Sequence, residues 1–98
     1  MFAFGDKEWP GIGKLIEECA EVGEICAKLM ATRGGRKHWD GYDLKHRLEE
    51  EVSDVLAAIK FVIDYCGLDR RTIETRCNYK YHKFERWHKE GDPQPVQE

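Results

Sequence analysis

Three stretches of this chain space their apolar residues in the way that is typical of amphipathic α-helices. In the first, apolar residues recur every three or four positions from Leu15 to Leu29, which places them on one face of a helix. Pro10 lies near its beginning, where the N–H that proline lacks would have no partner inside the helix. Two glycines follow shortly after Thr32, and glycine commonly ends helices. The pattern predicts a first helix from about Pro10 to about Thr32.

Two further helices are predicted, each preceded by an aspartate that can cap its N-terminus. After Asp43, the second runs from Leu44 to about Cys66 and stops at Gly67. Asp69 precedes the third, whose less polar stripe consists of Ile73, Cys77, Tyr81, Phe84 and His88. Because no stretch reads as a strand, the sequence predicts an all-α fold with three main helices.

The length of 98 residues is typical of one domain. We expect a single domain over residues 1–98, with a core from about 9 to 92, an irregular arm over 1–8 and a disordered tail at 93–98. Hydrophobic residues make up 41% of the chain and charged residues 36%, so apolar residues are fewer and charges more frequent than usual. A domain of this size buries only about 60–65% of the surface that its unfolded chain exposes, so its core is small. We therefore expect self-association to cover the remaining apolar surface.

Charge and hydropathy restrict the classes of partner. The formal net charge of −3 provides no general attraction to nucleic acid. The apolar stretches are shorter than the roughly 20 residues that span a membrane, and the first residues lack the pattern of a signal peptide. We expect a cytoplasmic protein with neither a nucleic-acid nor a membrane partner.

The four cysteines contain no CxxC pair. A zinc site made from them and a histidine would lack the usual ligand spacing. Cys19 and Cys26 lie seven residues apart on one predicted helix, while Cys66 and Cys77 flank a turn. We expect free, buried thiols that behave as small hydrophobic groups.

Acidic residues border the apolar stripes of the first two helices. Glu18 and Glu21 lie three residues apart, as do Glu51 and Asp54, and Glu17 lies four residues before Glu21. Residues three or four apart share one face of a helix. Acidic residues on helices often only coat a solvated face, but apolar residues surround the second pair closely. Carboxylates brought together between packed helices would repel one another without a cation, and oxygen ligands suit magnesium or manganese. Such a cluster is a natural partner for a phosphate substrate.

These residues carry a family resemblance. EECAE, followed by EVSD in the second predicted helix, resembles the EExxE…ExxD signature of the MazG-like nucleoside triphosphate pyrophosphohydrolases. The flanking KLIEECAEVGEICAKLM and RLEEEVSDVLAAIKFVIDYCGLD resemble the two core helices of that all-α superfamily, and KFERW resembles the end of its last helix. The resemblance covers about residues 9–92, and the segment 32–43 departs from the family's pattern.

The resemblance implies an enzyme that hydrolyses a (deoxy)nucleoside triphosphate to the monophosphate and pyrophosphate, in a housecleaning role. It also implies a homodimer or homotetramer in which helices of neighbouring subunits complete four-helix bundles. Magnesium is the expected cofactor, with manganese as a substitute, held by Glu18, Glu21, Glu51 and Asp54. Glu17 or Glu18 is expected to orient and deprotonate the attacking water.

The third predicted helix is strongly basic and offers candidates for substrate contacts. Metal ions neutralise only part of the charge of a triphosphate, so cations are needed on its solvent side. Lys80, Lys83 and Arg86 lie about one turn apart and are expected to contact phosphates, with Asn78 as a further polar contact. Trp9, just before the first helix, is a candidate for stacking on the base.

Two alternatives come from other classes of protein. In the first, the chain is a non-catalytic helical-bundle interaction module and its acids lie on the surface. In the second, the acids bind two bridged iron ions. Such iron sites typically add histidine from Glu-x-x-His motifs, and we do not expect one here.

Overall fold

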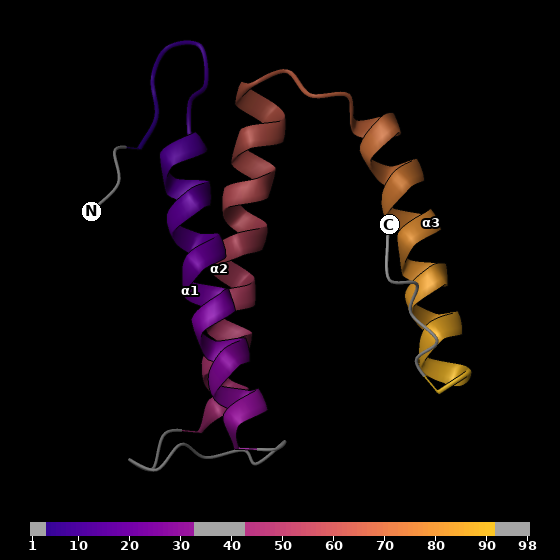
Figure 1. Cartoon of the computed structure of the whole chain (residues 1–98). Helices are drawn as coiled ribbons and strands as arrows, with labels where there is room; N and C mark the ends of the chain where they lie inside the picture. Colours follow the sequence, from indigo (N-terminus) through magenta and orange to yellow (C-terminus); the bar gives the residue numbers. More distant parts are fainter. Residues whose placement is uncertain (1–3, 33–42, 92–98) are drawn as a thin grey trace. The chain divides into compact units, whose positions relative to one another are not determined.

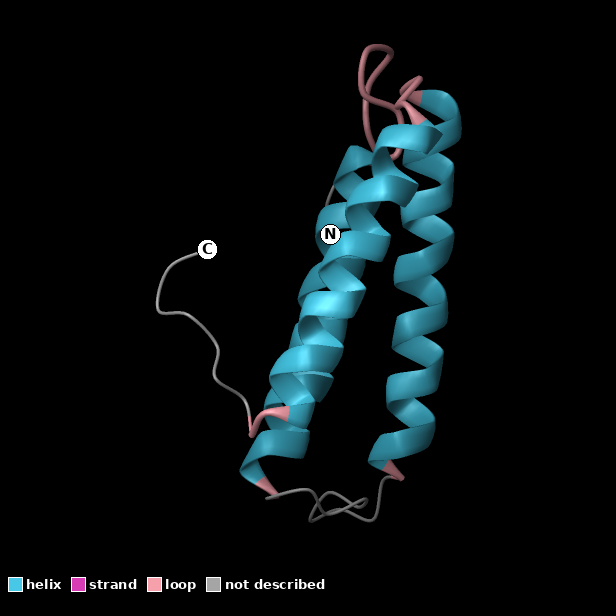
Figure 2. Cartoon of the chain, turned by 90° about the vertical axis from the view of Figure 1, so that its right-hand side faces the viewer, coloured by secondary structure: helices cyan, strands magenta, loops and turns pink. Residues whose placement is uncertain are grey.

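The computed structural model describes residues 4–32 and 43–91, which form helices and loops only (Figures 1 and 2). The three helices are α1 (Ile12–Ala31), α2 (Leu44–Tyr65) and α3 (Arg70–Lys89). Their bounds lie within two residues of those predicted from the apolar pattern. Within these two ranges there is no strand, so the prediction of an all-α fold is confirmed. No described helix combines the length and the apolar character needed to cross a membrane.

Both predicted aspartate caps are present. The Asp43 side chain accepts hydrogen bonds from the backbone N–H groups of Lys45 and His46, and Asp69 accepts them in the same way from Arg71 and Thr72. Each aspartate thus satisfies two N–H groups that have no partner inside the helix. α1 begins differently, after Gly11 in the left-handed conformation with φ 85° and without a side-chain cap.

α1 and α2 form an antiparallel hairpin (Figure 1). Its buried apolar residues are Ile25, Leu44, Ala58 and Val62, of which Leu44 is fully buried. Gly11 is also buried, against the Phe61 ring, where a methyl group would come within 2.6 Å of a ring carbon. The hairpin is therefore packed closely at its Gly11 end as well as along its middle.

The segment before α1 is attached to both helices of this hairpin. The Phe4 carbonyl oxygen accepts a hydrogen bond from the Lys14 N–H, 3.2 Å away, and the Cys66 thiol lies 3.4 Å from the Pro10 carbonyl oxygen. Phe4 also packs edge-on against Phe61, with the ring centroids 5.1 Å apart. These contacts place an aromatic side chain from the start of the chain beside α2.

The chain divides into two compact units, Met1–Leu68 with the hairpin and Asp69–Glu98 with α3. The single domain over residues 1–98 therefore stays a prediction. The predicted tail at 93–98 and the glycine pair after Thr32 lie outside the described residues. Within the second unit, Trp87 is the one buried residue that α3 contributes.

The prediction of buried thiols is wrong for three of the four cysteines. All four are free, Cys19, Cys26 and Cys77 are exposed, and Cys66 is half-buried. The reason is geometric for the two on α1. The buried positions of that helix are Glu18 and Ile25, and the next residue along a helix points about 100° away from its neighbour. The side chains of Cys19 and Cys26 therefore lie outside the face of α1 that packs against α2.

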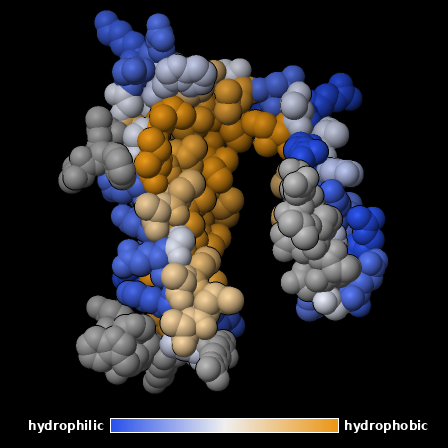
Figure 3. Space-filling view, viewed as in Figure 1, coloured by the Kyte–Doolittle hydropathy of each residue, from blue (hydrophilic) through white to orange (hydrophobic). Residues whose placement is uncertain are grey.

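Large apolar side chains also remain exposed on the hairpin. Along α2 they include Val52, Leu56 and Ile59, and on α1 they include Ile16 and Met30. Figure 3 shows an apolar surface that extends over the hairpin. The hairpin by itself thus buries only part of its apolar surface.

Candidate metal centre

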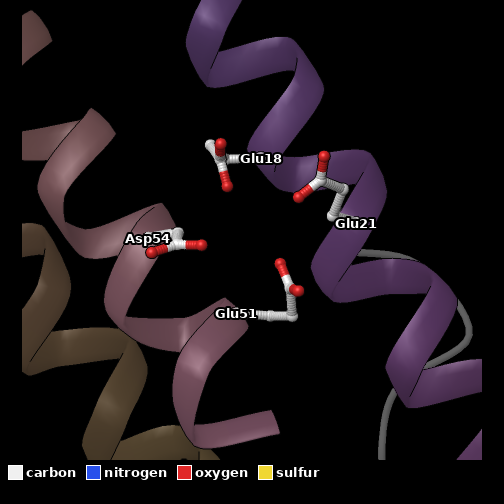
Figure 4. A group of neighbouring side chains, drawn as sticks. All are labelled: Glu18, Glu21, Glu51 and Asp54. Atoms are coloured by element: carbon white, nitrogen blue, oxygen red, sulfur yellow. The ribbon is translucent and has the colours of Figure 1, made fainter. Parts of the chain in front are cut away.

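Four carboxylates converge in the middle of the hairpin (Figure 4). Glu18 and Glu21 project from α1, and Glu51 and Asp54 project from α2. One oxygen from each of them lies within 4.8 Å of the others. Two oxygens on opposite sides of a single magnesium ion are about 4.2 Å apart. The cluster therefore has about the size of the oxygen shell of a small divalent cation.

The burial of two of these side chains supports a site rather than a solvated acidic face. Glu18 is only 9% exposed and Glu51 only 7%. The Oε2 atom of each is buried and has no hydrogen-bond partner among the described residues. A buried carboxylate oxygen without a partner is costly. A hard divalent cation would satisfy such oxygens, since it binds carboxylate oxygen in preference to nitrogen or sulfur.

The electrostatics agree with this interpretation. Burial raises the pKa of Glu51, and the neighbouring Glu21 carboxylate raises it further. Burial also raises the pKa of Glu18, with repulsion from Glu21 and Asp54 as further causes. Both groups are thus harder to ionise in the metal-free protein, and a bound cation would reverse this.

Two cations lie against the cluster, and neither was predicted from the sequence. The Lys14 ammonium is 2.9 Å from Glu17 Oε1 and 4.0 Å from Glu18 Oε1. An Arg47 guanidinium nitrogen is 3.3 Å from Glu51 Oε1. The signal was present, because Lys14 and Arg47 each precede a buried glutamate by four residues, the spacing at which helical side chains pair. The hydrogen bond to Glu17 is the main reason that the pKa of Lys14 is raised.

A pocket lies on each side of the cluster along the hairpin. On the Glu18 and Asp54 side, Lys14, Phe4 and Phe61 help to line a pocket of about 370 Å³. The other pocket, of about 310 Å³, is lined by Glu21, Glu24, Ile25, Lys28, Arg47 and Glu51. Of the residues described, the first pocket thus contains two aromatic rings and one cation, whereas the second contains two cations and no aromatic ring.

The remaining predicted site residues lie elsewhere. Glu17 is next to the cluster but outside the group of four, and it is bonded to Lys14. Trp9 is exposed, and it is not among the residues that line either pocket beside the cluster. The candidates on α3, Lys80, Lys83, Arg86 and Asn78, belong to the second unit. Their contact with substrate stays a prediction.

Two of the α3 candidates make contacts of their own. The Lys80 ammonium lies 5.8 Å from the Trp87 ring centroid and the Lys83 ammonium 5.5 Å from it, within the range of cation–π attraction.

α3 also carries a Glu-x-x-His motif of the kind used in di-iron bundles, at Glu85 and His88, which corrects the expectation that the chain has none. Neither α1 nor α2 contains such a motif, so the cluster itself remains a set of oxygen ligands.

Comparison of the chain with protein-family models, with curated proteins and with solved structures finds no match. The resemblance to the MazG-like pyrophosphohydrolases therefore stays a prediction from the residues that carry it.

Proposed function

We propose that this protein is a metal-dependent nucleotide pyrophosphohydrolase that converts a nucleoside triphosphate to the monophosphate and pyrophosphate. One observation carries the proposal: four carboxylates from two helices converge within 4.8 Å, and the two buried ones each keep an oxygen without a hydrogen-bond partner in the described part of the chain. This burial favours a metal centre over the alternative in which the acids only lie on the surface of a non-catalytic module.

The four carboxylates of Glu18, Glu21, Glu51 and Asp54 would hold magnesium, or manganese in its place. The bound ion would supply Lewis acidity toward phosphate oxygens and would lower the pKa of a coordinated water. Because all four ligands are anionic oxygens, the set favours these hard ions over zinc or copper.

Glu17 is suited to receive the proton of the attacking water. It lies beside Glu18 in the sequence but outside the four-carboxylate group, so its carboxylate is not needed as a ligand. The Lys14 ammonium donates a hydrogen bond to its Oε1 atom over 2.9 Å. This contact fixes the side chain beside the cluster, which is what a general base requires.

The aromatic pocket on the Glu18 side offers a place for the nucleoside. Phe4 and Phe61 line it together with Lys14. Any nucleobase can stack on an aromatic face, so this pocket accepts a base without selecting one strongly. Phe61 also stacks on Tyr65, with the ring centroids 4.3 Å apart, which holds the platform in place.

The reaction is tested by incubating the protein with deoxynucleoside triphosphates and magnesium and separating the products by chromatography. We expect monophosphate and pyrophosphate in equal amounts, because water that attacks the α-phosphate would release the two outer phosphates together as one leaving group. Accumulation of diphosphate and orthophosphate instead would identify a phosphatase and refute the proposal.

We further propose that the hairpin associates with a second copy of the chain. Val52, Leu56 and Ile59 are spaced by four and three residues, so they share one face of α2, and all are exposed. Burying such a stripe is favourable by about 25 cal/mol per Å². Helices of two copies packed in this way would form a four-helix-bundle-like module.

Light scattering at micromolar concentration should therefore give the mass of a dimer or tetramer. Leu56 is 60% exposed, so Leu56→Glu should dissociate the assembly while the helical circular dichroism is kept. A monomeric wild-type protein would contradict this proposal.

A further inference from the structure

The two pockets beside the carboxylate cluster differ in a way that would give a bound substrate a direction. The aromatic pocket lies toward the start of α1 and the end of α2. The other pocket lies toward the end of α1 and the start of α2, and its lining includes Lys28 and Arg47. Glu51 helps to line this second pocket, and its Oε2 atom is buried without a hydrogen-bond partner among the residues described. A metal ligand and two cations thus face the same space.

Arg47 has the chemistry and the position to bind a phosphate there. Its side chain is 43% exposed, and a guanidinium nitrogen lies 3.3 Å from Glu51 Oε1. Guanidinium groups present N–H donors in a fixed fork that matches phosphate oxygens. Once Glu51 shares its charge with a metal ion, its attraction for Arg47 falls. A phosphate bound to the same ion would then provide Arg47 with a nearby anion.

Lys28 provides a second positive charge in this pocket. Its ammonium lies 3.9 Å from Glu24 Oε1, and the Glu24 side chain is 68% exposed. A long ion pair with an exposed acid contributes little to stability. Lys28 can therefore exchange this contact for a phosphate oxygen at low cost.

We infer that the pocket lined by Lys28 and Arg47 binds the two outer phosphates of the substrate, the part that leaves as pyrophosphate. This inference rests on the proposed function. It assigns the substrate a direction along the hairpin, with the nucleoside in the Phe4 and Phe61 pocket and the leaving group at the Arg47 end. It also supplies, from the hairpin itself, the cations that the metal-bound triphosphate requires.

The test measures binding rather than turnover, with inorganic pyrophosphate as the probe. Magnesium alone, and then pyrophosphate in saturating magnesium, are titrated by calorimetry into the wild-type protein, Arg47→Gln and Lys28→Gln. Each variant should bind pyrophosphate about tenfold more weakly, the loss expected for one charge-assisted phosphate contact. Magnesium affinity should stay the same in Lys28→Gln, and it should stay the same or rise in Arg47→Gln, because Glu51 no longer pairs with a competing cation. Lys45→Gln is the control, since it removes an equal charge from an exposed position on α2.

The outcomes separate this inference from the proposed function. If the wild-type protein binds magnesium but both variants bind pyrophosphate as tightly as it does, the subsite is wrong and the metal centre stands. If Arg47→Gln loses magnesium and pyrophosphate together, Arg47 only supports the fold of the site, and the subsite is again wrong. If the wild-type protein binds no magnesium, the proposed function fails and this inference fails with it. Lys28→Gln keeps the test decisive should Arg47→Gln not fold.

Discussion

Replacing Glu51 with Gln should abolish magnesium-dependent hydrolysis while the protein stays folded. The amide keeps the size of the side chain but removes one of the four charges that would hold the ion. Changing a residue that only supports a metal ligand typically lowers metal affinity or activity 10–100-fold. Losing a ligand itself should therefore lower kcat/KM by about a hundredfold or more. Asp54→Asn should have the same effect. Steady-state rates with a deoxynucleoside triphosphate and magnesium provide the measurement.

Glu50→Gln is the matched control for this experiment. Glu50 precedes Glu51 directly, but its side chain is 53% exposed, so the same chemical change should leave the rate unaltered. Full activity in both Glu51→Gln and Asp54→Asn would show that the carboxylate cluster is not the catalytic site.

The metal-free proteins should show the complementary effect on stability. The pKa of Glu51 is raised in the folded protein above its ordinary value of 4.5, so folding favours the protonated group. The wild-type melting temperature should therefore rise as the pH is lowered from neutral toward about 5. Glu51→Gln should be more stable than the wild type at neutral pH, and it should gain less on acidification. Thermal melts in the presence of a chelator measure both effects.

Gly11→Ala should destabilise the hairpin severely. Gly11 has φ 85°, a conformation that costs an L-residue about 1–2 kcal/mol. The added methyl group would also lie 2.6 Å from Phe61 Cδ1, and forcing extra volume into a packed site costs a further 1–3 kcal/mol or so. The free energy of unfolding should fall by about 2–5 kcal/mol, which urea titration followed by circular dichroism can measure.

Gly23→Ala is the control, because it makes the same change in the middle of α1. A methyl group at Gly23 would meet no atom within 4 Å. Alanine is favoured over glycine in a helix interior, so this variant should gain roughly 0.5–1 kcal/mol. If Gly11→Ala unfolded at the same urea concentration as the wild type, the close packing of Gly11 against Phe61 would be disproved.

The three helices follow from local sequence, because the interactions that define them are local. Asp43 and Asp69 bond to N–H groups two and three residues later, and these contacts form wherever the chain is helical. The same holds for the pairing of Glu18 with Glu21 and of Glu51 with Asp54, which helical geometry brings to one face. The acids that could share a metal were therefore predictable from spacing.

Other features depend on which segments meet in space. Phe4 and Phe61 are 57 positions apart in the chain, and no periodicity indicates that their rings meet 5.1 Å from each other. The exposure of Cys19 and Cys26 likewise depends on the direction from which α2 packs on α1. The sequence shows a broad apolar stripe on α1, but only the contact with α2 selects the part that is buried.

The sequence alone thus determined the helices, their caps and the two acidic pairs, because each arises from residues within one turn of one another. Only the tertiary structure decided that the pairs face each other, since this requires α1 and α2 to pack antiparallel at one particular register. It also decided that Glu18 and Glu51 are buried while Glu50 is exposed, and that Lys14 and Arg47 lie against the cluster. A charge acts on its neighbours according to distance and burial, and neither quantity is set until distant parts of the chain pack together.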